Sequence, residues 1–206
     1  MKQILFNTEM VRTILDDRKT QTRRPIDWDI SNSMDGDVAS GYSVQTDDGL
    51  IDALKLYKYQ SGDILYVRET FAKLNDEGHV YYEYKADTGD PYPGEWPQEE
   101  AKGNPDAPKW KSSRHMPKEA ARLFLKVTNV RIERVPDISI KDIISEGLEG
   151  YIRHTVDDVY TKTEKELISE YQTLWDEIYE SKGYGWDTNC WIWVIEFERC
   201  EKQNEN

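Results

Sequence analysis

The sequence contains very little cysteine. Only Cys190 and Cys200 occur among its 206 residues. If the run between them is an extended strand, their Cα atoms lie roughly 30 Å apart at about 3.3 Å per residue, whereas a disulfide requires less than ~7 Å. We therefore expect two reduced thiols. Histidine is also scarce, and His79, His115 and His154 show no paired His or Cys spacing. We expect neither a metal site nor a cofactor.

Long hydrophobic runs are absent as well. No segment approaches the ~20 apolar residues of a membrane span, and the N-terminus lacks a signal-peptide profile, so we expect a soluble, cytoplasmic protein with no membrane partner. Hydrophobic residues make up only 37% of the chain. Seven Trp and thirteen Tyr compensate for that deficit, because each buried aromatic side chain removes ~150–250 Å² from water.

Positive charge is in deficit, since the formal net charge is -13. Neutralising the phosphates of a duplex needs an excess of Lys and Arg on the contact face. The acidic balance therefore argues against broad electrostatic binding to duplex nucleic acid. It leaves open the binding of a single nucleotide or a short strand in a local pocket.

Against this background, the stretch Leu15–Arg24 (LDDRKTQTRR) is densely cationic. Such a set either holds an anionic or carbonyl-bearing ligand or anchors a buried network of salt bridges. Both alternatives stay open. The residues that can donate hydrogen bonds from a cation or a hydroxyl are Arg18, Lys19, Thr20, Thr22, Arg23 and Arg24.

A second basic run covers Lys109–Arg122. Trp110 can stack a base while Lys111, Arg114 and His115 contact the backbone, which would make this run a nucleic-acid contact strip. The alternative is a solvated loop that balances nearby acids.

Arg68 and Glu69 form a further charged pair, within the predicted strand Ile64–Phe71. One interpretation is a salt bridge inside a barrel. The other makes both residues part of the wall of a ligand cleft.

Hydrophobic periodicity and capping residues predict a strand and a helix at the N-terminus. Mostly strands follow, with two further helices between them and a strand at the end. Hairpin-type turns, not helical crossovers, join most of these strands, which favours an α+β fold with a small β-barrel flanked by helices. The predicted elements are a strand at Lys2–Phe6, a helix from Asn7 or Thr8 to about Asp17, a strand at Ile64–Phe71 with its hairpin partner at Val80–Tyr84, a strand at Leu123–Val135, a helix from the capping pair Ser139 and Asp142 to Gly147, a helix behind the capping box Thr163–Glu166, and a strand at Trp191–Glu198.

Two segments interrupt this pattern. The segment Asp27–Tyr59 is rich in Asp, Ser and Gly up to Gly49 and is predicted to be a long surface loop, with Leu50–Tyr59 helical or extended. The segment Asp87–Pro108 carries five prolines and is predicted to be an irregular insertion. We therefore expect a single domain over residues 1–206 with insertions at about 27–59 and 87–108.

The order of several blocks resembles the ASCH family, in particular its bacteriophage and prophage branch. The blocks are ILFNTEMVRTILDDRKTQTRR, GDILYVRETF, HMPKEAAR, KVTNVRIERVPDIS, SEGL and NCWIWVIEFE. The resemblance covers most of the chain except the two insertions. It implies a β-barrel similar to the PUA RNA-binding domain, with a cleft lined by a Gly-x-Lys-x-x-x-x-Arg region and ligands of RNA or nucleotide type. Here Asp17 stands where the family motif has Gly, and Asp tolerates left-handed backbone better than most residues.

One branch of the family consists of N4-acetylcytidine amidohydrolases, and the resemblance places their catalytic positions at Lys19, Thr22 and Glu146. Thr22 would attack the acetamide, and Glu146 would protonate the leaving nitrogen. Lys19 would serve as the base if burial or the neighbouring arginines lower its pKa from ~10.4. Lys19 and Thr22 are three residues apart and would face opposite sides of a regular strand. The arrangement therefore requires a turn or bulge between them, which the junction between helix and strand can provide.

Glu146 precedes Gly147 in the last turn of its predicted helix, where a carboxylate is unfavourable to the helix dipole. This position suggests that Glu146 pairs with Arg23 or Arg24.

Three functions follow as hypotheses. The first is a binding module that accepts RNA or a modified nucleotide through Lys19, Arg23, Arg24 and the Lys111–Arg114 strip. The second is an amidohydrolase acting on N4-acetylcytidine-like nucleosides. The third is a phage protein that binds a host factor, its acidic surface mimicking nucleic acid.

Overall fold

The computed structural model describes residues 1–27, 30, 34–37, 41–46, 49–94, 98–102, 104, 107–149, 151–153 and 159–202. The chain divides into two compact units. Unit 1 comprises Met1–Asp17, Ile64–Lys126 and the chain from Arg199 onward, and unit 2 comprises Arg18–Asp63 and Val127–Glu198. The expectation of a single domain stays a prediction, because two such units can belong to one domain.

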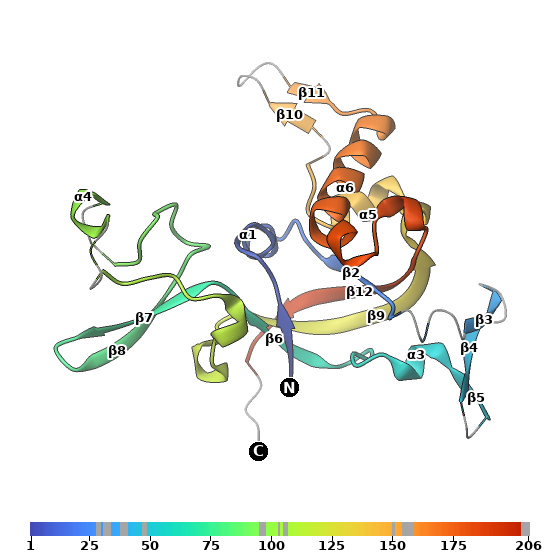
Figure 1. Cartoon of the computed structure of the whole chain (residues 1–206), viewed down its shortest axis with the longest axis horizontal. Coiled ribbons are helices and arrows are strands. Elements are labelled where there is room, and N and C mark those ends of the chain that lie inside the picture. The colour runs from blue at the N-terminus through green and yellow to red at the C-terminus, as the bar shows by residue number, and fades with distance from the viewer. Residues whose placement is uncertain are drawn as a thin grey trace. The chain divides into compact units, whose positions relative to one another are not determined.

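Unit 1 contains a short sheet in which β6 is the middle strand. Strand β1 lies parallel to β6, and the first residues of β9 lie antiparallel to it on the other side (Figure 1). The elements of this unit are β1 (Lys2–Leu5), α1 (Thr8–Leu15), β6 (Ile64–Arg68), β7 (Phe71–Asp76), β8 (His79–Tyr84), α4 (Gln98–Ala101) and the start of β9 (Phe124–Arg134).

Helix α1 begins where the sequence predicts. Asn7 is its N-cap, and the Asn7 side chain accepts a hydrogen bond from the Met10 amide at 2.8 Å. Val11 and Ile14 form its buried face. Beyond its last residue, Asp17 adopts a left-handed backbone with φ of 57°, so the conformation expected at the position of the family's glycine is present.

The hairpin predicted for Val80–Tyr84, joined across Asn75 to Gly78, is present, but its partner strand is not the predicted Ile64–Phe71. Strand β6 ends at Arg68, and the hairpin partner of β8 is β7. The turn lies at Glu77 and Gly78, which both have positive φ. The neighbour of β6 on one side is the parallel strand β1. Parallel strands are not joined by a tight turn, so no local turn signal in the sequence identifies that pairing.

Unit 2 combines most of β12 and β9 with the edge strand β2 and two helices. Strand β2 runs antiparallel to β12, with Thr22 opposite Ile195 and Arg23 opposite Val194. Its elements are β2 (Gln21–Pro25), β3 (Met34–Asp37), β4 (Gly41–Thr46), β5 (Gly49–Asp52), α3 (Ala53–Leu56), the rest of β9, α5 (Ile140–Ser145), β10 (Tyr151–Arg153), β11 (Val159–Thr161), α6 (Glu164–Tyr179) and β12 (Trp191–Cys200).

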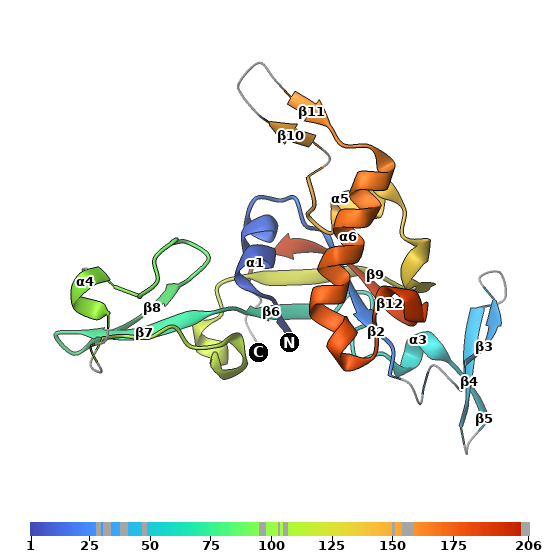
Figure 2. The ribbon, with the colours of Figure 1, turned by 45° about the horizontal axis from the view of Figure 1, so that its top comes forward.

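Helices α5 and α6 cover one side of this part of the sheet (Figures 1 and 2). Helix α6 begins with the predicted capping box of Thr163 and Glu166. The core between helices and sheet is a single cluster of buried residues, Val135, Ile138, Ile143, Leu167, Tyr171, Trp175, Cys190, Ile192 and Val194. Burial of this apolar surface fixes α5 and α6 against β9 and β12.

The prediction of a long surface loop is wrong for the described residues between 27 and 49, whereas the helical or extended structure predicted within Leu50–Tyr59 is present as the end of β5 and as α3. Strands β3, β4 and β5 form an antiparallel three-stranded sheet, and α3 follows directly. The sequence signal was the alternation of Tyr42 and Val44 with Ser43 and Gln45, which the many Asp and Gly residues around it obscured. In the second insertion, 87–108, the short helix α4 is the one regular element among the described residues.

The fold class is thus mixed, with several helices and several sheets. Within the described ranges the sheets are open, and no pairing closes a barrel. In those same ranges, no helix has both the length and the apolar character needed to cross a bilayer.

Candidate functional site

The cationic stretch enters unit 2 between α5 and β12. The Thr20 amide donates to the Ser145 carbonyl at 2.8 Å, and the Phe197 amide donates to the Thr20 carbonyl at 2.9 Å. These two bonds hold the residues before β2 beside the C-terminal end of α5. The Lys19 side chain therefore lies next to Glu146, the residue that caps α5.

Lys19 and Glu146 form a buried ion pair. The Lys19 Nζ lies 2.5 Å from Glu146 Oε2 and also donates to the Glu146 carbonyl at 3.0 Å. The two side chains are only 1% and 7% exposed. Because both charges are removed from water, each depends on the other for stabilisation.

Arg23 is held among three carboxylates. Its guanidinium lies 3.1 Å from Glu133, 3.4 Å from Asp142 and 3.3 Å from Glu146. The expected pairing of Glu146 with an arginine of the stretch is therefore confirmed for Arg23. The side-chain amide of Gln21 has one orientation in which both its nitrogen and its oxygen find partners: the nitrogen then donates to Asp142, and the oxygen accepts from Arg23.

The network extends through Arg131 and Arg24. Arg131 pairs with Glu133, Asp142 and Glu196. Arg24 donates to the Tyr179 hydroxyl at 3.3 Å. Among the residues that the structure describes, this cluster contains four cations and four carboxylates: Lys19, Arg23, Arg24 and Arg131, and Glu133, Asp142, Glu146 and Glu196. This arrangement corresponds to the buried-network alternative for the cationic stretch.

Burial sets the pKa of Lys19. Desolvation lowers the pKa of this amine below its ordinary value, Glu146 opposes the shift, and Arg24 and Arg23 add to it. A role of Lys19 as a base requires a lowered pKa, and the shift has this direction. At Asp142, burial alone would raise the pKa, but the Ser139 hydrogen bond and the Arg23 and Arg131 charges lower it overall.

The structure does not join Thr22 to the Lys19–Glu146 pair. Along β2 the side chains alternate, so Gln21 and Arg23 face the carboxylates and Thr22 faces the opposite side of the sheet. Thr22 is fully buried, and its Oγ1 has no hydrogen-bond partner among the residues that the structure describes. Of the three predicted catalytic residues, Lys19 and Glu146 are therefore in contact, and Thr22 is not hydrogen-bonded to either.

Arg18 lies at the solvent-exposed end of the same stretch. Its guanidinium donates to the Gly147 carbonyl at 3.0 Å and lies 3.6 Å from Glu149. Its side chain is 39% exposed. The exposed fraction of the side chain thus falls from 39% at Arg18 to 1% at Lys19.

In unit 1, Arg68 and Glu69 do not pair with each other. Arg68 donates to Gln3 at 2.6 Å and to the Arg114 carbonyl. The buried Glu69 carboxylate instead receives two hydrogen bonds from Arg122, at 3.0 and 3.1 Å. The salt bridge that the sequence suggested here therefore involves a different arginine, one that is distant in sequence.

The second basic run lies at the surface of unit 1. Lys109, Lys111, Arg114 and His115 are all exposed. None of these four side chains forms an ion pair within the described part of the chain. Trp110 is half-buried, and its indole N–H donates to the Asp90 carbonyl at 3.1 Å.

Sequence reasoning missed several residues that complete these clusters. Glu133 and Arg131 alternate in the strand sequence RIER, and Asp142 was recognised only as a capping residue. The charged residues of RIER were a visible signal, but nothing local indicated that they face Arg23. Tyr179 carried no such signal, and Arg122 was part of the second basic run but nothing local linked it to Glu69.

Comparison with known proteins returned no similarity: no family model matches the chain, and no curated protein or solved structure matches it.

Proposed function

We propose that the chain has an ASCH-type fold with a PUA-like barrel and binds single-stranded RNA or a nucleotide-type ligand. The order of sequence blocks supports the fold. The observation that carries the binding function is that Lys109, Lys111 and Arg114 in unit 1 are exposed and form no ion pair with any residue that the structure describes. Cations without carboxylate partners remain available to phosphate oxygens.

Three features favour a single strand over a duplex. The net charge of -13 opposes a broad contact with a duplex. A short strip of three cations suits a few phosphates of one strand. Trp110, held by its bond to Asp90, presents a half-buried ring beside those cations on which a base can stack.

The test is a titration of a short single-stranded RNA at two salt concentrations. Replacing Lys109, Lys111 and Arg114 together by Gln should weaken binding at least ten-fold. It should also reduce the slope of log affinity against log salt by about 2, since each lost contact to a single strand accounts for ~0.7. The matched control replaces Lys73, Lys141 and Lys165 by Gln, which are exposed lysines outside the run. Equal losses in the two triple variants would refute the assignment.

A second candidate function is amide hydrolysis on an acylated pyrimidine nucleoside, with Lys19 as base and Glu146 as acid; this reaction requires its nucleophile, Thr22, which faces the other side of β2, to turn towards Lys19. The observation in its favour is the desolvated Lys19, whose pKa is lowered while it contacts Glu146. A base works best when its pKa is near the working pH. Incubation with N4-acetylcytidine tests this function. Wild-type turnover should exceed that of Lys19→Ala and Thr22→Ala by at least a hundred-fold, and turnover equal to these variants would exclude it.

A further inference from the structure

A pocket of about 330 Å³ lies against α6 in unit 2. It is lined by Leu148, Glu170, Thr173, Leu174 and Glu177. Its volume is at the lower end of the range for small-ligand sites. Neither Lys19 nor the second basic run contributes to it, so its role is independent of the proposed function.

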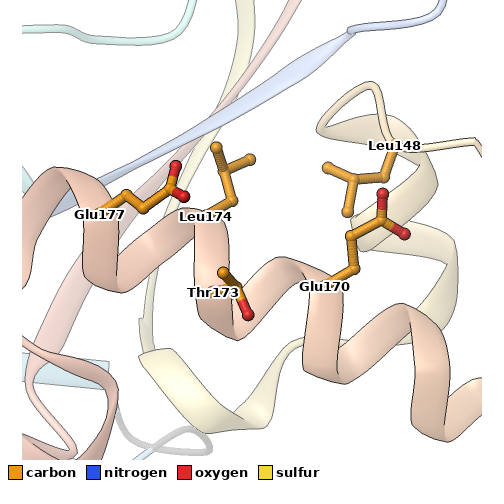
Figure 3. A pocket seen from close by; sticks show the side chains of 5 residues that line it. All are labelled: Leu148, Glu170, Thr173, Leu174 and Glu177. Carbon is orange, nitrogen blue, oxygen red and sulfur yellow. The ribbon is translucent and has the colours of Figure 1, made fainter.

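The lining combines an apolar floor with an acidic rim. The side chains of Leu148 and Leu174 point into one space, and the carboxylates of Glu170 and Glu177 lie on its two sides (Figure 3). The two glutamates are seven residues apart on one helix face. Two turns separate them, about 10 Å along the helix axis.

The helix beside the pocket is acidic, and its charge attracts cations. Helix α6 carries five acidic residues and one lysine in the sequence EKELISEYQTLWDEIY. Glu177 has no ion-pair partner within the described residues. Such a local excess of negative charge raises the concentration of cations near the helix.

An ion pair within the chain indicates the kind of cation that suits this pocket. The Lys162 Nζ lies 2.5 Å from Glu170 Oε2, and the Lys162 side chain is only 11% exposed. The ammonium group of Lys162 thus already bonds to one side of the rim. Glu177, at the other side, has no such group.

We propose that this pocket binds a linear aliphatic polyamine. One ammonium group pairs with Glu177 and a second with Glu170, while the methylene chain lies on Leu148 and Leu174. The Thr173 hydroxyl donates to the Ser169 carbonyl, so its oxygen remains able to accept a hydrogen bond from an ammonium group. A compact metal cation would reach only one of the two carboxylates and would not use the apolar floor.

The first experiment is calorimetric titration of the full chain with spermidine. We expect saturable binding that Glu177→Gln weakens roughly ten-fold, because a charge-assisted contact is lost. Glu164→Gln is the matched control, since it removes an exposed acid of the same helix outside the pocket. It should change the affinity less than two-fold.

The second experiment uses Lys162 as a competitor. Lys162→Ala frees Glu170 and should tighten spermidine binding several-fold. Lys165→Ala makes the same change in net charge at an exposed position of the same helix and should leave the affinity unchanged. A difference between these two variants separates a defined site from a diffuse acidic surface.

Four results would overturn the proposal. Spermidine binding that does not saturate is the first, and equal effects of Glu177→Gln and Glu164→Gln are the second. The third is displacement of spermidine by magnesium chloride at the same concentration. The fourth is binding of the peptide Lys-Leu-Lys in the absence of spermidine binding, which would assign the pocket to a basic protein segment.

Discussion

The two basic regions of the chain differ in what surrounds their cations. In unit 2, Lys19 and Arg23 are buried and each contacts at least one carboxylate. In unit 1, Lys109, Lys111 and Arg114 are exposed and contact none within the described residues. Both regions look alike in the sequence as short runs of Lys and Arg. The difference shows that the carboxylates brought in by the fold, and not the number of cations, decide which run is available to an anionic partner.

Removing a buried cation should have the largest effect. Arg23→Met leaves Glu133, Asp142 and Glu146 close together without the guanidinium that separates them. We expect a loss of about 3–5 kcal/mol in the free energy of unfolding, measured by chemical denaturation. The matched change Arg114→Met in the exposed run should cost at most about 0.5 kcal/mol. Similar losses at both positions would remove the contrast between the regions.

A second substitution tests whether the large loss of stability expected at Arg23 is due to its burial or to its location in unit 2. Glu69 lies in unit 1 but is buried and receives two hydrogen bonds from Arg122. Glu69→Gln should cost about 1.5–3 kcal/mol, because these bonds are charge-assisted. The exposed Glu119→Gln serves as control in denaturant titrations. If Glu69→Gln lowers the free energy of unfolding no more than Glu119→Gln does, burial does not explain the difference between the regions.

Asp142→Asn should have a smaller and pH-dependent effect. The pKa of Asp142 is held below its usual value of 3.8, despite its burial, by Ser139, Arg23 and Arg131. The folded chain therefore binds fewer protons than the unfolded chain in acid, and the stability due to this group is lost as pH falls through the folded pKa. The difference between wild type and Asp142→Asn should be constant above about pH 5 and shrink below pH 4. Thermal melting across pH measures it, and a difference that grows in acid would contradict the account.

The smallest effect is expected at Arg18, within the same stretch as Arg23. Its ion pair with Glu149 is exposed and 3.6 Å long. Arg18→Ala should cost less than about 1 kcal/mol, as is usual for surface pairs. Glu149→Ala should cost as little, and the small loss should decrease further in high salt. A loss at Arg18 comparable to that at Arg23 would mean that sequence position, not burial, determines the contribution.

Local signals in the sequence predicted part of this structure well. The Asn7 cap and the box of Thr163 and Glu166 depend on residues that are near one another in the chain, and both are present. The last strand is also present, although Ile192–Ile195 are all buried and their burial does not alternate. The left-handed backbone at Asp17 was expected only from the resemblance, whose motif has Gly at that position. Each of these features is decided within a few residues.

The missed features depend on distant partners. The parallel pairing of β1 with β6 joins segments about sixty residues apart. The carboxylates around Arg23 come from β9 and α5, more than a hundred residues away. A run of Lys and Arg contains no information on which carboxylates will meet it, so the sequence left a ligand site and a buried network as equal alternatives.

The most direct test of the account is ultraviolet cross-linking of a single-stranded RNA to the full chain, followed by peptide mapping. The account predicts cross-links in the peptide that contains Trp110, Lys111 and Arg114. Cross-links confined to the peptide from Arg18 to Arg24 would contradict it, because those cations would then have to leave their carboxylates to bind the RNA.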